Sequence, residues 1–407
     1  MGLKKLNTAL RKHVEELEES GRAKGKELVI KKVIKPVDNK GPRYLLEGHG
    51  DQEFIKMNAN SYLGLSLRND MLAAEEEGAK NFGVGPGAVR FISGTYTPHI
   101  KLEEKLAKFH NREEGMIFSS AYITSLGVIY PLTNEDTYLI SDELNHNCII
   151  NAMRLSKPAG KAIYKHNNMD DLEKKVKSTI GKAKRALVVT DGIFSMRGDN
   201  APLDRIVEIC NKYYDEFEEG LISIVDDSHG VGAFGKTGRG TEEYTNTKVD
   251  ILIGTLGKAF GVNGGYVVSS SNVIRFLRES APTYIYSNPI TASECKAATK
   301  AIEILQSEEG DRILTHLREM TEYFENGLQE AGFETIKGKH PVVPLMVRDT
   351  QKTRKMVEYL TKNGILATGL NFPVVPKGDE EIRFQISAAH TREDIEYVLE
   401  VLNNYES

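Results

Sequence analysis

The stretch VDILIGTLGKAFG, residues 249–261, decides the predicted fold. Its first half is an apolar run without polar alternation, which indicates a strand that is covered on both faces. Lys258 follows this run directly, among glycines and other small residues. Because a lysine is ordinarily a solvated surface residue, one held at the end of a buried strand points to a lysine that acts on a ligand.

Three upstream stretches repeat this arrangement of an apolar run with a polar end. The polar ends are DELNHN at 142–147, TDGIFSMRGD at 190–199 and DDSHGVGAFG at 226–235. Helical patterns separate the runs, so a parallel or mixed sheet in an α/β domain is predicted. Ligands of such sheets bind beyond the carboxyl ends of the strands. The residues expected to share one pocket are therefore His146, Ser195, Asp226, His229 and Lys258.

The 407 residues exceed what one compact core usually needs, so more than one domain is expected. The α/β pattern predicts a large domain over 60–288. Residues 289–407 follow an order of strand, helix, strand and helix that is typical of a small α+β domain. Residues 1–59 are expected to add a segment to it, after a helix with apolar residues at three- and four-residue steps. That stripe predicts an arm that packs on its own domain or on a second subunit.

The composition is that of an ordinary soluble globular protein, with 40% hydrophobic and 27% charged residues and a net charge of −5. Lysines and arginines are scattered, which argues against nucleic acid as a partner. The three cysteines lie far apart and predict neither a disulfide nor a metal site, as expected of a cytoplasmic protein. No targeting segment and no apolar run of membrane-spanning length is visible, so no membrane partner is expected.

A buried lysine with a carboxylate and two histidines suits pyridoxal 5'-phosphate. Burial keeps the amine of Lys258 nucleophilic toward an aldehyde, and Asp226 stands where a partner for the pyridine nitrogen is needed. His229 is suited to the ring hydroxyl and His146 to stacking on the ring. Taken singly, an aspartate and a histidine after a strand are more often a turn or a cap. The combination, rather than any one residue, therefore predicts the cofactor.

VDDSHGVGAFGKTGRG followed by GTLGKAFGVNGGY resembles the α-oxoamine synthase family of fold-type I pyridoxal-phosphate enzymes. The resemblance runs from NANSYLGL at 58–65 to IRFQISAAHT at 382–391. It implies a large domain with a mainly parallel seven-stranded sheet, a smaller α+β C-terminal domain and an N-terminal helical arm. It also implies condensation of an amino acid with an acyl-CoA, in a homodimer with shared active sites.

The resemblance implies roles for the residues of the expected pocket. Lys258 matches the lysine that holds the cofactor and then serves as general base. Asp226 matches the partner of the ring nitrogen, and His146 matches the stacking histidine. His229 and Ser195 match groups near the ring hydroxyl oxygen. His146 and Ser195 are also expected to contact the substrate.

Further matches concern the phosphate and the substrate. Ala121 and Tyr122 match the backbone cradle of the phosphate, which Thr255 joins. Ser287 and Asn288 match residues that reach the phosphate in the neighbouring subunit. Asn60 and Arg383 match the residues that orient the amino-acid substrate. Arg383 is expected to hold the substrate carboxylate by a bidentate pair.

Within the family, VRFISGT at 89–95 and YIYSN at 284–288 are most similar to glycine C-acetyltransferases. The predicted reaction is glycine with acetyl-CoA, giving 2-amino-3-oxobutanoate and CoA. Users of succinyl-CoA typically carry an asparagine where Phe91 stands, which disfavours that acyl group. The alternatives are an 8-amino-7-oxononanoate synthase using alanine and pimeloyl-CoA, an activity like serine palmitoyltransferase, an aminotransferase and a non-catalytic pyridoxal-phosphate-binding protein.

Overall fold

The computed structural model describes residues 2–20, 22–23, 25–372 and 374–405. Its largest sheet has seven strands in the order β4-β10-β9-β8-β7-β5-β6. The five strands from β9 to β6 are parallel, and β10 runs antiparallel to both of its neighbours. The predicted α/β fold with a mainly parallel seven-stranded sheet is confirmed. The strands are β4 (Glu114–Phe118), β5 (Thr137–Asp142), β6 (Gly160–Tyr164), β7 (Arg185–Asp191), β8 (Leu221–Asp226), β9 (Ile251–Thr255) and β10 (Gly265–Ser269).

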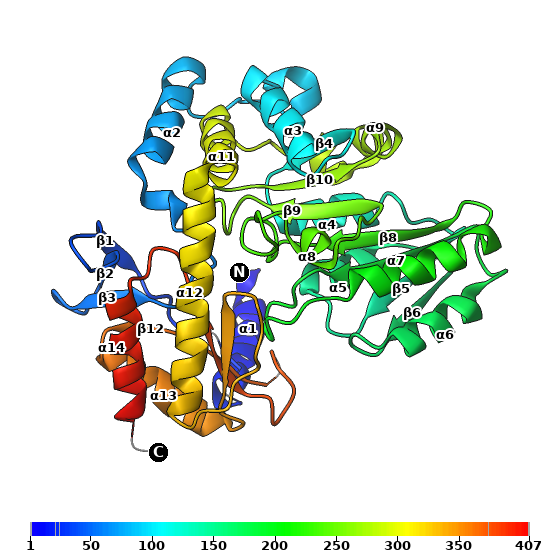
Figure 1. The fold of residues 1–407 in the computed structure, drawn as a ribbon. Coiled ribbons are helices and arrows are strands. Elements are labelled where there is room, and N and C mark those ends of the chain that lie inside the picture. Colours follow the sequence, from blue (N-terminus) through cyan, green and yellow to red (C-terminus); the bar gives the residue numbers. More distant parts are fainter. Residues whose placement is uncertain (1, 21, 24, 373, 406–407) are drawn as a thin grey trace.

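Helices cover both faces of this sheet (Figure 1). Successive side chains of a strand point to opposite faces. In β7, Val188 joins one apolar core while Leu187 joins a second, and this accounts for strands without polar alternation. The helices between and beside the strands are α3 (Thr97–Phe109), α4 (Ala121–Ile129), α5 (Asn147–Leu155), α6 (Met169–Thr179), α7 (Leu203–Lys212), α8 (Thr241–Thr245), α9 (Ser271–Ser280) and α10 (Pro282–Ile285).

Two smaller sheets form the other part of the molecule. One has the order β11 (Val342–Met346), β14 (Glu381–Gln385) and β13 (Thr368–Leu370). The other joins β1 (Ile30–Ile34), β2 (Arg43–Leu46) and β3 (Glu53–Lys56) to β12 (Ile365–Leu366), which runs parallel to β3. Segments from the two ends of the chain thus share one sheet.

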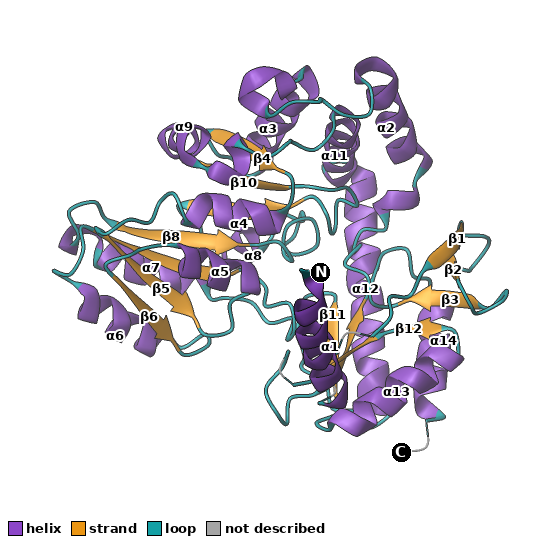
Figure 2. Ribbon diagram, turned by 180° about the vertical axis from the view of Figure 1, so that it is seen from behind, coloured by secondary structure: helices purple, strands orange, loops and turns teal. Residues whose placement is uncertain are grey.

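Long helices accompany these sheets and connect the two parts (Figure 2). Phe324 of α12 packs against Phe384 of β14, with ring centroids 5.1 Å apart. In the described part of the chain, no helix has the length and apolar character needed to cross a membrane. The remaining helices are α2 (Asn69–Phe82), α11 (Ala292–Leu305), α12 (Glu308–Glu330), α13 (Thr350–Lys362) and α14 (Arg392–Asn403), with short helical turns at Leu65–Leu67, Arg90–Gly94 and Tyr214–Glu216.

The predicted N-terminal helix is confirmed as α1 (Leu3–Glu19), which Figure 2 shows on the near side of the molecule. Its apolar stripe does not enter the core of its own chain. Leu3, Leu6 and Leu10 are 64%, 50% and 52% exposed, and the helix buries none of its residues. Packing on a second subunit therefore stays the prediction for this arm.

Candidate active site

The four polar strand ends that the sequence singles out lie next to one another, because β9, β8, β7 and β5 are neighbours in the sheet. Beyond them lies a cavity of about 200 Å³. All five residues expected to form one pocket line this cavity. The lining residues are Ala121, Tyr122, His146, Cys148, Asp191, Ser195, Asp226, Ser228, His229 and Lys258.

Lys258 reaches the cavity from the turn after β9 and is half-buried. Burial lowers the pKa of its amine to about 8, although the charges of Asp226 and Asp191 act in the opposite direction. The guanidinium of Arg383 adds to the lowering. A larger fraction of this lysine is thus a free, nucleophilic amine near neutral pH than of a surface lysine.

Asp226 ends β8 and is 5% exposed. Its two carboxylate oxygens accept hydrogen bonds from the hydroxyls of Ser125 and Ser228, at 2.6 and 2.5 Å. The thiol of Cys148 lies 3.5 Å from the same oxygen that Ser125 contacts. Such donors stabilise a buried carboxylate and fix its orientation toward the cavity.

A second carboxyl group, that of Asp191, lies beside Asp226, because the two residues pair in register between β7 and β8. Burial and the charge of Asp226 raise the pKa of Asp191 well above its usual range. Its Oδ2 accepts the backbone N–H of His146 at 2.8 Å. Asp191 therefore fixes the start of α5, where His146 is the N-terminal cap.

His146 presents its ring to the cavity opposite Tyr122, with centroids 6.3 Å apart and planes nearly perpendicular. The backbone N–H of Cys148 donates to His146 Nδ1 at 3.3 Å. Desolvation lowers the pKa of the imidazole, which favours the neutral ring. A neutral, fixed ring is suited to stack on a flat aromatic group.

The N-terminus of α4 forms another wall, with Ala121 and Tyr122 at its first two positions. The first N–H groups of a helix have no acceptor within the helix and attract anions. Ser120 accepts the N–H of Ile123, which leaves the two earlier positions at the cavity. Thr255 does not line the cavity, since its hydroxyl contacts the carbonyl of Gly264 and the N–H of Gly257.

His229 closes the side of the cavity that faces the C-terminal sheets. Its Nδ1 lies 2.7 Å from the hydroxyl of Tyr62, and its carbonyl oxygen lies 2.8 Å from His340 Nε2. Burial, followed by the charge of Lys258, lowers the pKa of His229 well below its usual range. The ring is therefore neutral and held by Nδ1, so that Nε2 remains for a ligand.

Arg383 lies on β14 and approaches the large sheet, where its Nη1 donates to the carbonyl of Ser195 at 3.0 Å. Among the described residues, its Nε has no hydrogen-bond partner although it is buried. Asn60 lies nearby, since its Oδ1 accepts from Tyr62 at 3.3 Å and from Gln385. A partly buried guanidinium that has a donor without a partner among the described residues is suited to bind a carboxylate.

Ser287 and Asn288 do not line this cavity, and Asn288 is exposed. Both follow α10, next to Tyr286, which is 80% exposed. Phe91 is also outside the lining and is 63% exposed. The positions that the resemblance assigns to the neighbouring subunit or the acyl group thus lie on the surface of the single chain.

Comparison with known proteins agrees with this geometry. The family model for aminotransferase class I and II matches residues 52–402. The 8-amino-7-oxononanoate synthase of Thermosipho melanesiensis is 39% identical over 351 residues, 86% of this chain and 87% of that protein. The chain belongs to the α-oxoamine synthase family. Seven further relatives that are 35–41% identical bear the same name, one of them as putative.

Solved structures of this family are similar along the whole chain. The serine palmitoyltransferase of Sphingomonas wittichii has a TM-score of 0.88 and 27% identity, covering 98% of this chain and 97% of that one. A structure of SPT with PLP has a TM-score of 0.87 and 26% identity, with the same coverage. Pyridoxal phosphate is accordingly the cofactor, and the protein is a pyridoxal-phosphate-dependent acyltransferase. The similarity to glycine C-acetyltransferases that the motifs suggest finds no support among these relatives.

The residues of the cavity fit this cofactor. Lys258 offers an amine of lowered pKa, and Asp226 offers a buried carboxylate for the ring nitrogen. The first turn of α4 offers N–H groups to the phosphate. His146 offers a ring face, so each part of the cofactor has a counterpart in the cavity lining.

Cys148, Asp191 and Ser228 also line the cavity, but sequence reasoning did not find them. The sequence does indicate Asp191 as a candidate, because it ends an apolar strand, as Asp226 does. Ser228 follows Asp226 by two residues, and its contact is a local turn. The position of Cys148 depends on how α5 lies against β8, and no spacing in the sequence indicates this.

Proposed function

We propose that this protein is an 8-amino-7-oxononanoate synthase, which condenses L-alanine with pimeloyl-CoA and releases CoA and carbon dioxide. The supporting observation is the single cavity in which Lys258, Asp226, His146 and His229 meet. The name of the relatives that are 35–41% identical supports the choice of substrates. It favours alanine and a long acyl group over glycine and acetyl-CoA.

In this proposal Lys258 has two roles. Its amine would hold the cofactor, and its Nζ, when free, would accept the proton from the substrate Cα. Pyridoxal phosphate, when bound, supplies an aldehyde for amines and a ring that withdraws electrons from that Cα. The lowered pKa of Lys258 serves both roles, because only the neutral amine attacks an aldehyde or accepts a proton.

The other residues bind and orient the cofactor and the amino acid. Asp226 would keep a proton on the ring nitrogen, and His146 would cover one face of the ring. His229 and Ser195 lie where the ring hydroxyl is expected. The backbone of Ala121 and Tyr122 holds the phosphate, with Thr255 as a further candidate.

The substrate carboxylate is proposed to bind Arg383, with Asn60 beside it. This guanidinium stands near Lys258, since its charge lowers the pKa of that amine. An alanine held by its carboxylate would therefore present its Cα toward Nζ. His146 and Ser195 line the cavity together with Lys258, whereas Arg383 and Asn60 are not among its lining residues.

The active enzyme is proposed to be a homodimer, in which Ser287 and Asn288 reach the phosphate of the neighbouring subunit. The exposure of Asn288 and the partial exposure of Ser287 next to Tyr286 support this, because side chains that complete a partner's site lie on the surface of the single chain. The exposed stripe of α1 supports the same assignment.

The test measures thiol release by the protein loaded with pyridoxal phosphate. L-Alanine, glycine and L-serine are each combined with pimeloyl-CoA, acetyl-CoA and palmitoyl-CoA. We expect the highest kcat/KM for L-alanine with pimeloyl-CoA, and a product with the mass of 8-amino-7-oxononanoate. Faster thiol release with glycine and acetyl-CoA would contradict the proposal and favour the reaction that the motifs predict.

Matched variants separate the catalytic lysine from a general effect of lost charge. Lys258→Ala should abolish thiol release. Lys236→Ala removes an exposed lysine outside the cavity lining and should leave release unchanged. Retained release in Lys258→Ala would exclude this cavity as the active site.

A further inference from the structure

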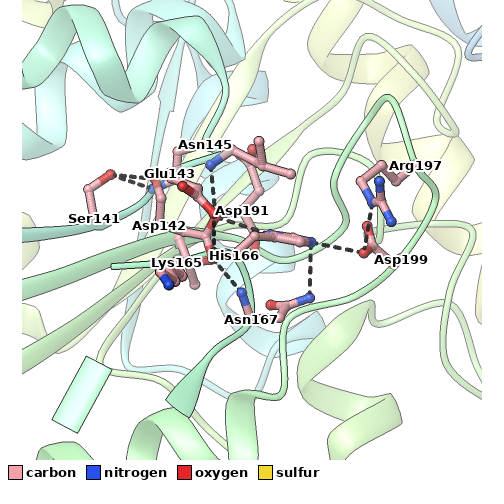
Figure 3. Close-up of polar contacts among 12 residues, drawn as sticks. Ser141, Asp142, Glu143, Asn145, Lys165, His166, Asn167, Asp191, Arg197 and Asp199 are labelled. Carbon is pink, nitrogen blue, oxygen red and sulfur yellow. Dashed lines mark hydrogen bonds and ion pairs between the residues drawn. The ribbon is translucent and has the colours of Figure 1, made fainter. Parts of the chain in front are cut away.

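His166 lies between Asp142, at the end of β5, and Asp199, in the loop that follows β7 (Figure 3). It follows β6 and does not line the cavity. Its Nδ1 is 3.1 Å from Asp142 Oδ1, at the end of β5, and its Nε2 is 2.9 Å from Asp199 Oδ2. One imidazole thus joins two carboxylates from different elements.

Both contacts are satisfied only by a protonated ring. A neutral imidazole has one N–H donor, so its other nitrogen would direct a lone pair at a carboxylate. Burial by itself lowers the pKa of His166, but the hydrogen bonds that its ring donates to Asp142 and Asp199 outweigh this effect and raise the pKa to about 9. The side chain is 16% exposed, so water screens these contacts only in part.

Other charged groups around His166 do not reverse this balance. Its backbone N–H donates to Glu143 at 2.8 Å, which adds a third carboxylate. Arg197 is the opposing cation, with its Nε 3.4 Å from the oxygen of Asp199 that His166 contacts. Asn167 Nδ2 lies 3.3 Å from His166 Nε2 but donates to the carbonyl of Asn200 at 3.2 Å, so the N–H of the protonated His166 ring remains directed at Asp199.

The Asp142 end of the contact belongs to the rigid sheet. Its Oδ2 accepts the N–H of Asn167 at 2.9 Å, and its Oδ1 accepts that of Leu144 at 2.9 Å. The chain then turns toward His146 at the start of α5. His166 is therefore anchored on the side of the large sheet.

The Asp199 end belongs to the loop at 192–200. The N–H of Phe194 donates to the carbonyl of Asp199 at 2.9 Å, which closes the loop. The ring of Phe194 stands edge-on to His166, with centroids 4.4 Å apart. Ser195 follows Phe194, and its carbonyl receives Arg383 Nη1. A displacement of Asp199 would thus be transmitted to the guanidinium.

We propose that the imidazolium of His166 is a positioning residue for the amino-acid substrate: by holding Asp199, it fixes the Ser195 carbonyl and so sets Arg383 in place for the substrate carboxylate. This inference rests on the proposed function, in which Arg383 binds that carboxylate. It concerns binding of the amino acid, and neither the cofactor nor the acyl-CoA.

The test titrates the protein loaded with pyridoxal phosphate, wild type and His166→Gln, by the absorption change on adding an amine. L-Alanine is compared with ethylamine, which is alanine without its carboxylate. We expect His166→Gln to raise the Kd of L-alanine about tenfold, because a displaced Arg383 guanidinium would no longer be aligned with the substrate carboxylate. The Kd values of ethylamine and of pyridoxal phosphate should stay within about twofold, since neither depends on Arg383.

Two further variants complete the design. His49→Gln changes a histidine that packs on Phe54 in the N-terminal sheet and should alter neither Kd. Asp199→Asn breaks the same contact from the other side and should repeat the selective loss for L-alanine. It also provides the test if His166→Gln fails to fold.

Several outcomes would overturn the inference. These are equal weakening of L-alanine and ethylamine, no weakening of either, or a nitrogen NMR titration that shows a neutral His166 ring at pH 7. A wild-type protein that responds to ethylamine but to no amino acid would instead overturn the proposed function, and this inference with it.

Discussion

At the scale of single residues, protonation of Lys258 controls how the cofactor is captured. Burial among the cavity walls lowers the pKa of its amine to about 8. An amine is nucleophilic only when deprotonated, so its reactive fraction rises as the pH passes upward through that pKa. The charges of Asp226 and Asp191 favour the protonated amine and so limit how far burial lowers its pKa.

We therefore predict that the apoprotein captures pyridoxal phosphate at a rate that rises with pH, with a midpoint near 8. Borohydride reduction followed by mass spectrometry of Lys258 peptides would measure the rate. Lys258→Ala should show no attachment, whereas Lys236→Ala should behave as the wild type. A midpoint above 10 would mean that the amine is solvated rather than desolvated.

Arg383 allows a second prediction at this scale. Arg383→Lys keeps the charge but loses the planar fork that pairs with a carboxylate. We expect the KM for L-alanine to rise about tenfold in Arg383→Lys and about a hundredfold in Arg383→Ala. The KM for pimeloyl-CoA should change by less than about threefold. Steady-state kinetics with each substrate varied in turn would reveal an equal loss for both, which would place the carboxylate elsewhere.

At the scale of elements, the close approach of α4 to β10 shapes the phosphate site. A Cβ on Gly265 would lie 2.4 Å from the backbone nitrogen of Ala121 and 2.5 Å from its Cα. Backbone atoms cannot yield as a flexible side chain does, so the first turn of α4 would have to move. Gly265 thus sets the position of the N–H groups proposed to bind the phosphate.

Gly265→Ala should therefore weaken binding of pyridoxal phosphate about tenfold. Fluorescence titration of the apoprotein would measure the change in Kd. Gly85→Ala is the control, because a Cβ there meets no atom within 4 Å. If both variants bind the cofactor equally well, the start of α4 is not the phosphate site.

At the scale of the whole molecule, residues from distant parts of the chain meet at one site. Lys258 and Asp226 come from the large sheet, Arg383 from a C-terminal strand, and Tyr62 from the segment that follows β3. The interface between these parts brings the charge of Arg383, which we propose binds the substrate carboxylate, close enough to Lys258 to lower the pKa of its amine. Relative movement of the two parts of the molecule would change the distance between Arg383 and Lys258.

The proposed homodimer predicts complementation between two inactive variants. Lys258→Ala lacks the lysine, and Asn288→Ala lacks the side chain expected to reach the partner's phosphate. A mixed dimer would contain one intact site, with Lys258 from one subunit and Asn288 from the other. Refolding the two variants together should restore activity that neither shows alone. Activity no higher than the sum of the separate preparations would argue against shared sites.

The sequence by itself determined the α/β fold and the strand ends that carry the site, because buried parallel strands read as apolar runs and their polar ends meet at one edge. The number of seven strands followed from the resemblance to the family. It also determined Lys258, Asp226, His146 and His229 as one group. The motifs did not determine the substrates, since glycine and acetyl-CoA found no support among relatives of another name. No continuous apolar run marks the edge strand β6, because its residues alternate between exposed and partly buried positions.

Only the tertiary structure placed Asp191 beside Asp226, Tyr62 against His229 and His166 between two carboxylates. These contacts join residues that are far apart in the chain and depend on strand register and on loop closure. A local pattern encodes whether a strand is buried, but not which side chain of another element it meets. The physical reason is that burial is a property of a segment, whereas a hydrogen-bonded site is a property of distances between segments.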